Sequence, residues 1–296
     1  MTVRWVCRLG VFAAALSTVL AAGCRRKEPV APPVATATVR LSHQKAPLGS
    51  PLDLTYKFVV ASDAHFTEDL RVMAHVVDTD GELLFTFDHV PPVPTSQWKP
   101  GETVEYARTE FIPVYPYVGE TTIQLGLYSI QTQKRQPLAG EDAGQRAYKA
   151  ATLMLQPQTE NVFVVYKVGW HPAEVADHNT GVEWQWTKRT GTLAFKNPKK
   201  DCLFYLDVDH PANVFQEAQQ VELTINGERV DQFTLGPGQR QLKKMPLKAA
   251  QFGSGDTVEM QIAVDKTYVP ALLHVSDNRD PRELGVRVFH AYVDAR

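Results

Sequence analysis

The chain has 296 residues and a formal net charge of -2 at pH 7, which argues against a nucleic-acid binder because neutralising phosphates requires a basic face. Its hydrophobic content of 44% and charged content of 22% are typical of a globular protein and not of a disordered one. The length suffices for two domains, and no segment after the N-terminal region is apolar for long enough to cross a bilayer as a helix.

The first 24 residues have the order of a secretory signal. Arg4 and Arg8 precede an uncharged apolar run at residues 11–22, which is too short to span a bilayer as a stable helix. Small residues then lead to Cys24, and the sequence LAAGC at residues 20–24 resembles the lipobox of bacterial lipoproteins, with Ala21 where that pattern usually has Leu. The resemblance implies a signal peptide at residues 1–23 and an acyl chain such as palmitate on Cys24. The alternative is an ordinary signal peptide cleaved nearby, with Cys24 incidental.

Residues 24–36 are expected to form a tether, because their prolines favour an extended and semi-rigid chain. The basic triplet at residues 25–27 either contacts anionic headgroups or is ordinary polarity after a signal peptide. Arg25 is not Asp, so the signal that retains lipoproteins in the inner membrane of some bacteria is missing. We therefore expect a protein of the bacterial cell envelope, held to a membrane by lipid, on the outer membrane or facing the periplasm.

Residues 37–156 predict a β-sandwich of immunoglobulin-like size. Short runs that alternate or are apolar throughout are expected as strands at residues 38–41, 52–60, 71–77, 82–87, 103–112, 121–130 and 153–155. Asp80 and Gly81 stand between two of these runs and predict a hairpin. Residues 137–150 are polar, and we expect a loop or a short helix there.

Residues 157–296 predict a second sandwich, of jelly-roll type, so that the chain is all-β with two tandem domains. Its strands are expected at residues 162–166, 182–187, 191–195, 203–208, 221–225, 230–235, 241–245, 258–264 and 286–293. Asn226 and Gly227 predict another hairpin. The polar stretch at residues 169–180 is expected as a loop, and residues 215–220 as one turn of helix.

After processing, Cys202 is the one cysteine left, so the two cores must stabilise the protein without an internal disulfide. It lies in a strand-like run, which predicts a small buried apolar residue. The alternative is a reactive thiol, for which no positive partner is evident in the sequence.

Short motifs occur in both halves. The second half contains GWHPAE at residues 169–174, WQWT at 184–187, VELTING at 221–227 and DPRELGVRV at 280–288. These resemble the β-sandwich modules attached to bacterial glycosyltransferases and other surface-polysaccharide proteins. In the first half, QWKPGE at 97–102, FIP at 111–113 and LGLY at 125–128 are similar to the sandwich that accompanies protein-mannosyltransferase-like membrane enzymes. The multi-spanning catalytic domain of those enzymes does not occur in these 296 residues, so the resemblance implies an accessory role and leaves transferase activity in doubt.

Three of the five tryptophans lie within 17 positions. Trp184 and Trp186 are two apart, so they share one face of a strand and would suit stacking on a sugar ring, with polar side chains such as Arg189 bonding hydroxyls. The alternative is that both are core residues, since aromatic side chains dominate the interior of sandwiches. Trp170, in a loop, is expected to be the better exposed. The candidate ligand-binding residues are Trp170, His171, Glu174, Trp184 and Trp186.

Residues 277–283 carry five charges in seven positions beside an apolar strand. Arg and Asp form bidentate pairs that can lock the shape of a loop, and this structural interpretation is preferred. The alternative is a polar ligand site at the edge of the sandwich. The residues concerned are Asp277, Arg279, Asp280 and Arg282.

Metal and catalytic sites are not expected. One group of metal-ligating side chains is His171, Asp177 and His178, and another is Asp207, Asp209 and His210, but neither has a recognised zinc spacing. Asp207 and Asp209 could offer oxygens to calcium, although alternating Asp residues more often line a solvated strand face. No motif of a serine hydrolase, a zinc protease or a phosphate loop occurs, and nothing pairs two carboxylates across a sugar bond.

These observations favour a non-catalytic envelope lipoprotein without a cofactor, which binds carbohydrate or supports the assembly of surface polysaccharide. A second hypothesis is an adaptor that docks an envelope protein complex, which exposed apolar or edge-strand surface would favour. An enzyme acting on cell-wall glycans is the third.

Overall fold

The structure, a computed structural model, describes residues 31–176, 179–211, 214–273 and 279–295. The expected signal peptide and Cys24 lie outside the described residues, as do Asp177, His178 and Asp277. Apart from short 3-10 turns, the regular elements in the described part are β-strands, which confirms the predicted all-β class. Within these residues, no helix has the length and apolar character that crossing a membrane would require.

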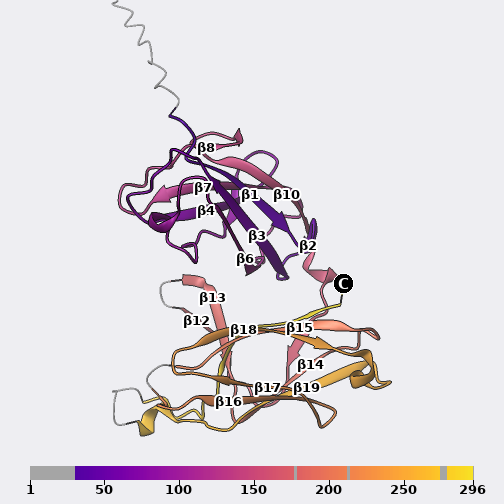
Figure 1. Cartoon of the computed structure of the whole chain (residues 1–296). Coiled ribbons are helices and arrows are strands. Elements are labelled where there is room, and N and C mark those ends of the chain that lie inside the picture. Colours follow the sequence, from indigo (N-terminus) through magenta and orange to yellow (C-terminus); the bar gives the residue numbers. More distant parts are fainter. Residues whose placement is uncertain (1–30, 177–178, 212–213, 274–278, 296) are drawn as a thin grey trace, which may run out of the picture. The chain divides into compact units, whose positions relative to one another are not determined.

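The first sandwich consists of two sheets (Figure 1), with strand orders β6–β3–β1–β8 and β2–β10–β7–β4–β5, and with β9 paired to β10. Most neighbouring strands are antiparallel, while β1 with β8 and β2 with β10 are parallel. The strands span Ala35–Leu41 (β1), Lys45–Pro47 (β2), Pro51–Val60 (β3), Leu70–Val77 (β4), Leu83–Thr86 (β5), Thr103–Phe111 (β6), Gly119–Ser129 (β7), Leu138–Ala139 (β8), Glu141–Asp142 (β9) and Tyr148–Gln156 (β10).

The core of the first sandwich follows from alternation along the strands. Leu54, Tyr56 and Phe58 of β3 are fully buried, whereas the residues between them are half-buried or exposed. They face Leu125 and Leu127 of the other sheet in one hydrophobic cluster. Burying one face of each sheet against the other is what fixes the strand register, because a shift by one residue would expose every one of these side chains.

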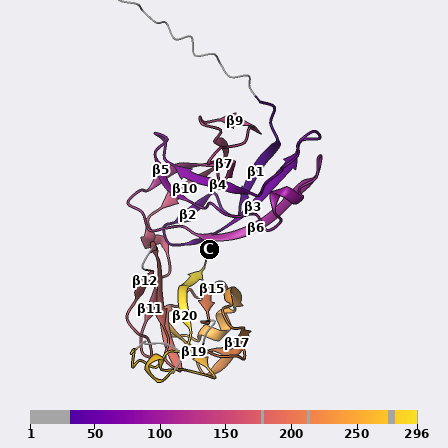
Figure 2. The same cartoon turned by 90° about the vertical axis from the view of Figure 1, so that its left-hand side faces the viewer.

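The second sandwich also has two sheets (Figure 2), with strand orders β11–β14–β19–β16–β17 and β12–β13–β20–β15–β18. All of its strand pairs are antiparallel. The strands span Val164–Tyr166 (β11), Glu174–Ala176 (β12), Asn179–Trp186 (β13), Thr190–Lys196 (β14), Cys202–Asp209 (β15), Gln219–Ile225 (β16), Glu228–Leu235 (β17), Arg240–Leu247 (β18), Thr257–Val264 (β19) and Arg287–Asp294 (β20).

The second core lies between these two sheets. Phe204, Leu206 and Val208 of β15 are fully buried and pack in one cluster with Leu223 and Ile262 of the other sheet. Cys202 belongs to the same cluster, as predicted for a small apolar residue. Burial, reinforced by the nearby carboxylates of Asp294 and Asp201, raises its pKa to about 11, which opposes the alternative of a reactive thiol.

Both predicted hairpins are confirmed. Gly81 lies in the turn between β4 and β5, and Asn226 and Gly227 connect β16 to β17 with positive φ angles of 52° and 80°.

Three local expectations differ from the structure. Residues 137–150, expected as a loop or a short helix, are largely a loop but contain the two-residue strands β8 and β9 and the first residues of β10. The expected loop at 169–180 contains β12 and the first residues of β13. Residues 215–220 form no helical turn, because β16 already begins at Gln219. Strands of two or three residues carry too little alternation to be recognised without their partners.

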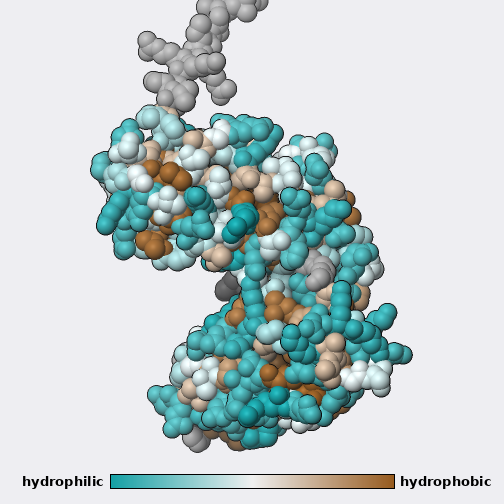
Figure 3. Space-filling view, turned by 45° about the vertical axis from the view of Figure 1, so that its right-hand side comes forward, coloured by the Kyte–Doolittle hydropathy of each residue, from teal (hydrophilic) through white to brown (hydrophobic). Residues whose placement is uncertain are grey.

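Figure 3 shows a largely hydrophilic surface on which hydrophobic residues form small separate patches.

Candidate functional site

The outer side of the sheet β12–β13–β20–β15–β18 gathers aromatic, acidic and guanidinium groups. On β15, Val208 points into the core, so Asp207 and Asp209 point to the outer side. Directly opposed residues share a side, and Trp186 is opposite Arg287, which in turn is opposite Asp209. We call this surface the aromatic face and define it by Glu174, Trp184, Trp186, Asp207, Asp209, Arg240, Arg287, Phe289 and His290.

A series of hydrogen bonds and an ion pair connects Trp184 to the charged loop that precedes β20. Trp184 is opposite Glu174, and its Nε1 donates a hydrogen bond of 3.2 Å to Glu174 Oε2. The other carboxylate oxygen, Oε1, lies 2.7 Å from Arg282 Nη1. Arg282 also donates to Asp280, from Nε to Oδ1 at 3.0 Å and from Nη2 to Oδ2 at 2.7 Å. Glu174 and Arg282 are each about one-third exposed, so a ligand can reach them.

Arg282 acts as the connection between the two acids. Its pKa is raised, first by the hydrogen bond to Asp280, against the opposing effect of burial, and then by Glu174. The hydrogen bonds from Arg282 lower the pKa of Asp280 in turn. The Asp280–Arg282 pair therefore has the bidentate geometry expected of a locked loop, and it reaches the aromatic face through Glu174.

Two further guanidinium groups lie over aromatic rings of the same face. Arg287 donates to both oxygens of Asp209, at 2.7 and 2.6 Å, and its Cζ lies 5.3 Å from the centroid of Trp184. Arg240 does the same with Asp207, at 2.9 and 2.6 Å, and lies 3.7 Å from the centroid of Phe289. Asp207 and Asp209 are each only 7% exposed, and the guanidinium partner of each provides the hydrogen bonds that a buried carboxylate needs.

His290 also contacts Asp207, because His290 Nδ1 lies 3.2 Å from Asp207 Oδ2. Burial would raise the pKa of Asp207, but the hydrogen bonds from Arg240 and His290 hold it below its ordinary value. Asp207 is therefore a fixed negative charge at neutral pH.

A β-bulge in β20 allows Phe289 and His290 to lie on this face together. The register of β20 against β15 shifts between Asp207 and Val208, so that two consecutive residues, Phe289 and His290, stand where the pairing leaves room for one. Both rings then lie on the outer side, Phe289 under Arg240 and 6.0 Å from Trp184 between centroids. Bulges commonly redirect a side chain in this way. Phe289 is two residues from Arg287 and shares its side by alternation, and the bulge adds His290, which is directly opposite Asp207.

The aromatic residues differ in accessibility. Trp186 is buried, with Tyr268 at 5.9 Å and the Arg287 guanidinium at 5.5 Å from its ring. Trp184 and Phe289 are half-buried and remain in part open to solvent. Neither Trp184 nor Trp186 belongs to the interior cluster of the second sandwich, so their shared strand face is the outer one and not the core.

Trp170 does not belong to the aromatic face; it is half-buried, as Trp184 is, whereas Trp186 is buried. Its ring packs against the second core and 4.6 Å from Tyr166, and its Nε1 donates 2.8 Å to the carbonyl of Thr192. A Cβ on Gly191 would lie 2.8 Å from Trp170 Cε2, so this glycine makes the close packing of the indole possible. Trp170 is thus held as a structural residue.

The remaining candidates have local partners. His171 Nε2 lies 2.7 Å from the carbonyl of Glu283, and Arg189 donates to the carbonyl of Asp265. Arg279 is exposed. Of the predicted site residues, the structure brings Glu174, Trp184, Trp186, Asp280 and Arg282 together, and it adds Phe289, Arg240 and Arg287 to them.

In the described part of the chain, no group of three or more His, Cys, Asp or Glu side chains is arranged to hold a metal ion. Asp207 and Asp209, the calcium candidates, give their oxygens to guanidinium groups instead. His210 is fully buried, and burial lowers its pKa.

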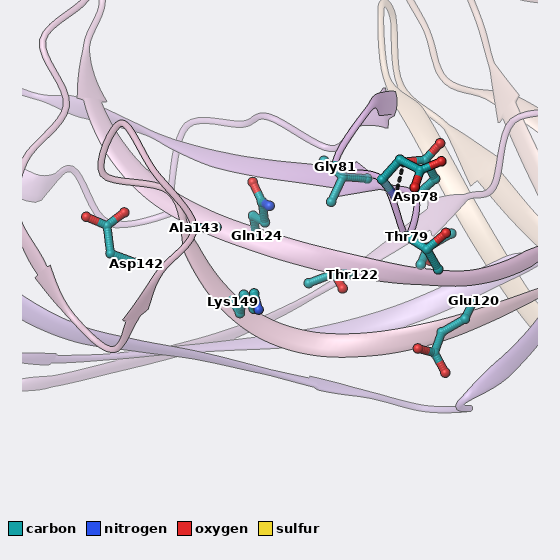
Figure 4. A pocket seen from close by; sticks show the side chains of 12 residues that line it. Asp78, Thr79, Gly81, Glu120, Thr122, Gln124, Asp142, Ala143 and Lys149 are labelled. Atoms are coloured by element: carbon teal, nitrogen blue, oxygen red, sulfur yellow. Dashed lines mark hydrogen bonds between the residues drawn. The ribbon is translucent and has the colours of Figure 1, made fainter.

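A separate hollow of about 470 Å³ lies in the first sandwich and is acidic (Figure 4). Asp78, Glu120 and Asp142 contribute carboxylates from different segments around it. Asp78 Oδ1 already accepts hydrogen bonds from the backbone N–H groups of Asp80 and Glu82, which shape the β4–β5 turn. Asp78 therefore has a structural role in stabilising this turn.

No known family model matches the sequence, and a search of curated proteins found none with significant similarity. Solved structures that resemble the chain include carbohydrate-binding modules and domains of bacterial surface or secreted proteins. The carbohydrate-binding module CBM36, solved with calcium and xylotriose, is 14% identical, with 45% of this chain and 96% of that one covered, at a TM-score of 0.24.

The tandem CBM22-1–CBM22-2 domain of Paenibacillus barcinonensis Xyn10C is 10% identical, with 88% and 93% covered and a TM-score of 0.27. The CBM51-2 and INT domains of Clostridium perfringens ZmpB, solved with GlcNAc, are 9% identical, with 87% of this chain and 40% of that one covered and a TM-score of 0.25. Likenesses at these TM-scores carry no inference about what this chain binds.

Proposed function

We propose that this protein is a non-catalytic lipoprotein of the bacterial envelope whose second sandwich binds carbohydrate on the aromatic face. The observation that carries the proposal is the cluster formed by the partly open rings of Trp184 and Phe289 beside the one-third exposed Glu174 and Arg282.

Sugar recognition needs an apolar platform and hydrogen-bonding groups held at its rim. Pyranose rings present C–H groups that pack on aromatic side chains, and Trp184 supplies such a surface beside the Phe289 ring that Arg240 covers. Glu174 can accept from hydroxyl groups and Arg282 can donate to them, and the contacts to Trp184 and Asp280 hold both side chains in place. Groups already held by their neighbours lose little conformational entropy when a ligand binds.

The charges of the face favour a neutral glycan. Each guanidinium that we describe there has a carboxylate partner, Arg240 with Asp207, Arg287 with Asp209 and Arg282 with Asp280 and Glu174. An uncharged ligand can bind without breaking these pairs, whereas an anionic one would compete for their cations.

The experiment is a glycan array followed by titration calorimetry, with neutral oligosaccharides of glucose, mannose, xylose and N-acetylglucosamine as probes. We expect Trp184→Ala to weaken binding at least about tenfold, the loss of one stacked ring being worth ~1–2 kcal/mol. Tyr115→Ala, which removes an exposed ring of the first sandwich, is the matched control and should bind as the native chain does. Native protein that binds none of these glycans, or equal binding by Trp184→Ala, would refute the proposal.

The lipid anchor rests on the sequence LAAGC at residues 20–24. We expect the chain to incorporate labelled palmitate when it is expressed in a bacterium, and Cys24→Ser to abolish the label. Label that survives this substitution would contradict an anchor at Cys24.

A protein-docking role is the second candidate, favoured by the connection between β6 and β7. Val114, Tyr115 and Val118 are each more than one-third exposed there, close together in the chain. Crosslinking in the envelope with a photoreactive residue at position 115 tests it. A crosslinked protein partner would support an adaptor, and crosslinks to lipid or to nothing would oppose one.

A further inference from the structure

The edge strand β11 of the second sandwich exposes apolar side chains on the outer side of its sheet. Residues 162–166, VFVVY, are apolar at every position, a pattern typical of a strand covered on both faces. Val162, Val164 and Tyr166 pack against the second core. Phe163 and Val165, which point the other way, are each 52% exposed. One face of the strand is therefore apolar without anything in the described chain covering it.

The exposed apolar surface continues past the end of the strand. Val168 is 77% exposed, in the turn after β11. Beneath Phe163 and Val165 lies a hollow of about 770 Å³, whose lining includes the paired strand β14 through Ala194, directly opposite Val165. We call Phe163, Val165 and Val168 together with this hollow the β11 surface.

Three lysines surround the β11 surface. Lys167 and Lys196 line the hollow, and Lys188 lies beside Val168, because its backbone N–H donates 2.8 Å to the carbonyl of Gly169. All three are exposed, and in the described part of the chain none forms a salt bridge. Their positive charges are therefore available to a partner.

Two carboxylates on this side of the sheet lie away from the three lysines or have another partner. Asp256 lines the hollow, but its carboxylate lies 3.5 Å from Lys199 Nζ. Glu259 is opposite Ala194 on β19, one strand further from the edge of the sheet. The side toward the edge is thus apolar and cationic.

We propose that the β11 surface contacts an anionic phospholipid bilayer. Protruding aliphatic and aromatic side chains enter the boundary between headgroups and acyl chains, while lysines around them are attracted to anionic headgroups. The arrangement of Phe163, Val165 and Val168 among Lys167, Lys188 and Lys196 satisfies both requirements. The aromatic face belongs to the other sheet of the sandwich, so this inference does not depend on carbohydrate binding.

The test is sedimentation of the full chain with lipid vesicles, using the Cys24→Ser variant so that no acyl chain contributes. Vesicles of phosphatidylcholine are compared with vesicles that also contain phosphatidylglycerol. We expect binding to the anionic vesicles alone, weakening as salt is added, because the lysines act through screened electrostatic attraction.

Two variants assign the binding to the β11 surface. Lys167→Glu and Phe163→Ser, each added to Cys24→Ser, should lower partitioning at least about tenfold, since each lysine near an anionic surface is worth ~1 kcal/mol and reversal adds repulsion. Lys57→Glu on β3 and Val175→Ser on β12, both at exposed positions, are the matched controls and should bind unchanged.

Unfolding cannot explain a loss in Lys167→Glu if its circular dichroism and melting temperature match those of the parent. No vesicle binding, equal binding to both lipid compositions, or binding unchanged by Lys167→Glu and Phe163→Ser would each overturn the proposal. Because sugar binding is measured on Trp184, either proposal can fail without the other.

Discussion

The two sandwiches differ in where their polar networks lie. The network of the first is in the interior, between its two sheets, and the network of the second is on the outer surface of one sheet. In the first, His89 is 4% exposed and lies inside the sandwich, where its Nε2 is 2.7 Å from the hydroxyl of Tyr106 and its Nδ1 is 2.9 Å from the carbonyl of Phe87. In the second, Asp207, Asp209 and their arginines lie on the outer side of a sheet.

The difference separates groups that hold a fold together from groups that a ligand can reach. The carbonyl of Phe87 only accepts, so Nδ1 of His89 carries the proton and Nε2 accepts from Tyr106. This contact connects residues on the two sheets, with the ring of Tyr56 at 4.7 Å. The network of the second sandwich is satisfied too, but the guanidinium of Arg240 and the ring of His290 keep part of their surface open.

The largest effect is expected from His89→Ala. It removes two buried hydrogen bonds and leaves a cavity beside Tyr56, which should lower the free energy of unfolding of the first sandwich by ~3 kcal/mol. Urea denaturation measures this change. His65→Ala, at an exposed histidine, is the control and should leave the midpoint in place, and an equal shift in both variants would disprove the interior role of His89.

The pH dependence of stability sharpens the same contrast. Burial lowers the pKa of His89 from 6.5 to about 4, so the folded state keeps the ring neutral where the unfolded state takes up a proton. The stability that this provides is complete above pH 6.5 and is lost as the pH falls toward 4, by at most ~3 kcal/mol.

Denaturation midpoints measured between pH 6.5 and 4 test whether the lowered pKa of His89 causes this loss of stability. Asp88, whose pKa is held low by His75 and the backbone of Ala74 against the effect of burial, loses its contribution only below about pH 4 and does not obscure the effect. We expect His89→Ala to have a flatter profile between pH 6.5 and 4 than the native chain. Identical slopes would contradict the assignment.

A smaller loss is expected from Asp209→Asn on the aromatic face. It leaves the guanidinium of Arg287 without its bidentate partner, and we expect a loss of ~1–2 kcal/mol in the unfolding of the second sandwich. Asp201→Asn, which breaks the solvent-exposed pair with Lys248, should have no measurable effect. If both variants melt alike, the pairs of the aromatic face are no more important than ordinary surface pairs.

The smallest effect is expected from Arg282→Lys. A lysine keeps the charge but cannot bind Asp280 in bidentate fashion while it also reaches Glu174. We expect binding of a neutral oligosaccharide to weaken about threefold, with no change in melting temperature, which titration calorimetry resolves. Unchanged affinity would mean that Arg282 does not position Glu174 for a ligand.

Much of the fold was predictable because strand alternation and the turns at Asp80–Gly81 and Asn226–Gly227 are local signals. The aromatic face was predictable only in part. Trp184 and Trp186 share a face through their spacing alone, whereas the close packing of Trp170 depends on Gly191 of a neighbouring strand. The place of His290 beside Phe289 required the bulge in β20, and the bidentate partners of Asp207 and Asp209 required the register with β18 and β20.

The most direct test of the aromatic face follows the indole N–H signals of the tryptophans by NMR during titration with the neutral oligosaccharide that binds. We predict that the signal of Trp184 moves with saturation, because this N–H lies at the candidate sugar platform and is bonded to Glu174. The signals of Trp170 and Trp98, bonded to backbone carbonyls of Thr192 and Val93, should stay in place. A titration in which Trp170 or Trp98 moves and Trp184 does not would contradict sugar binding on this face.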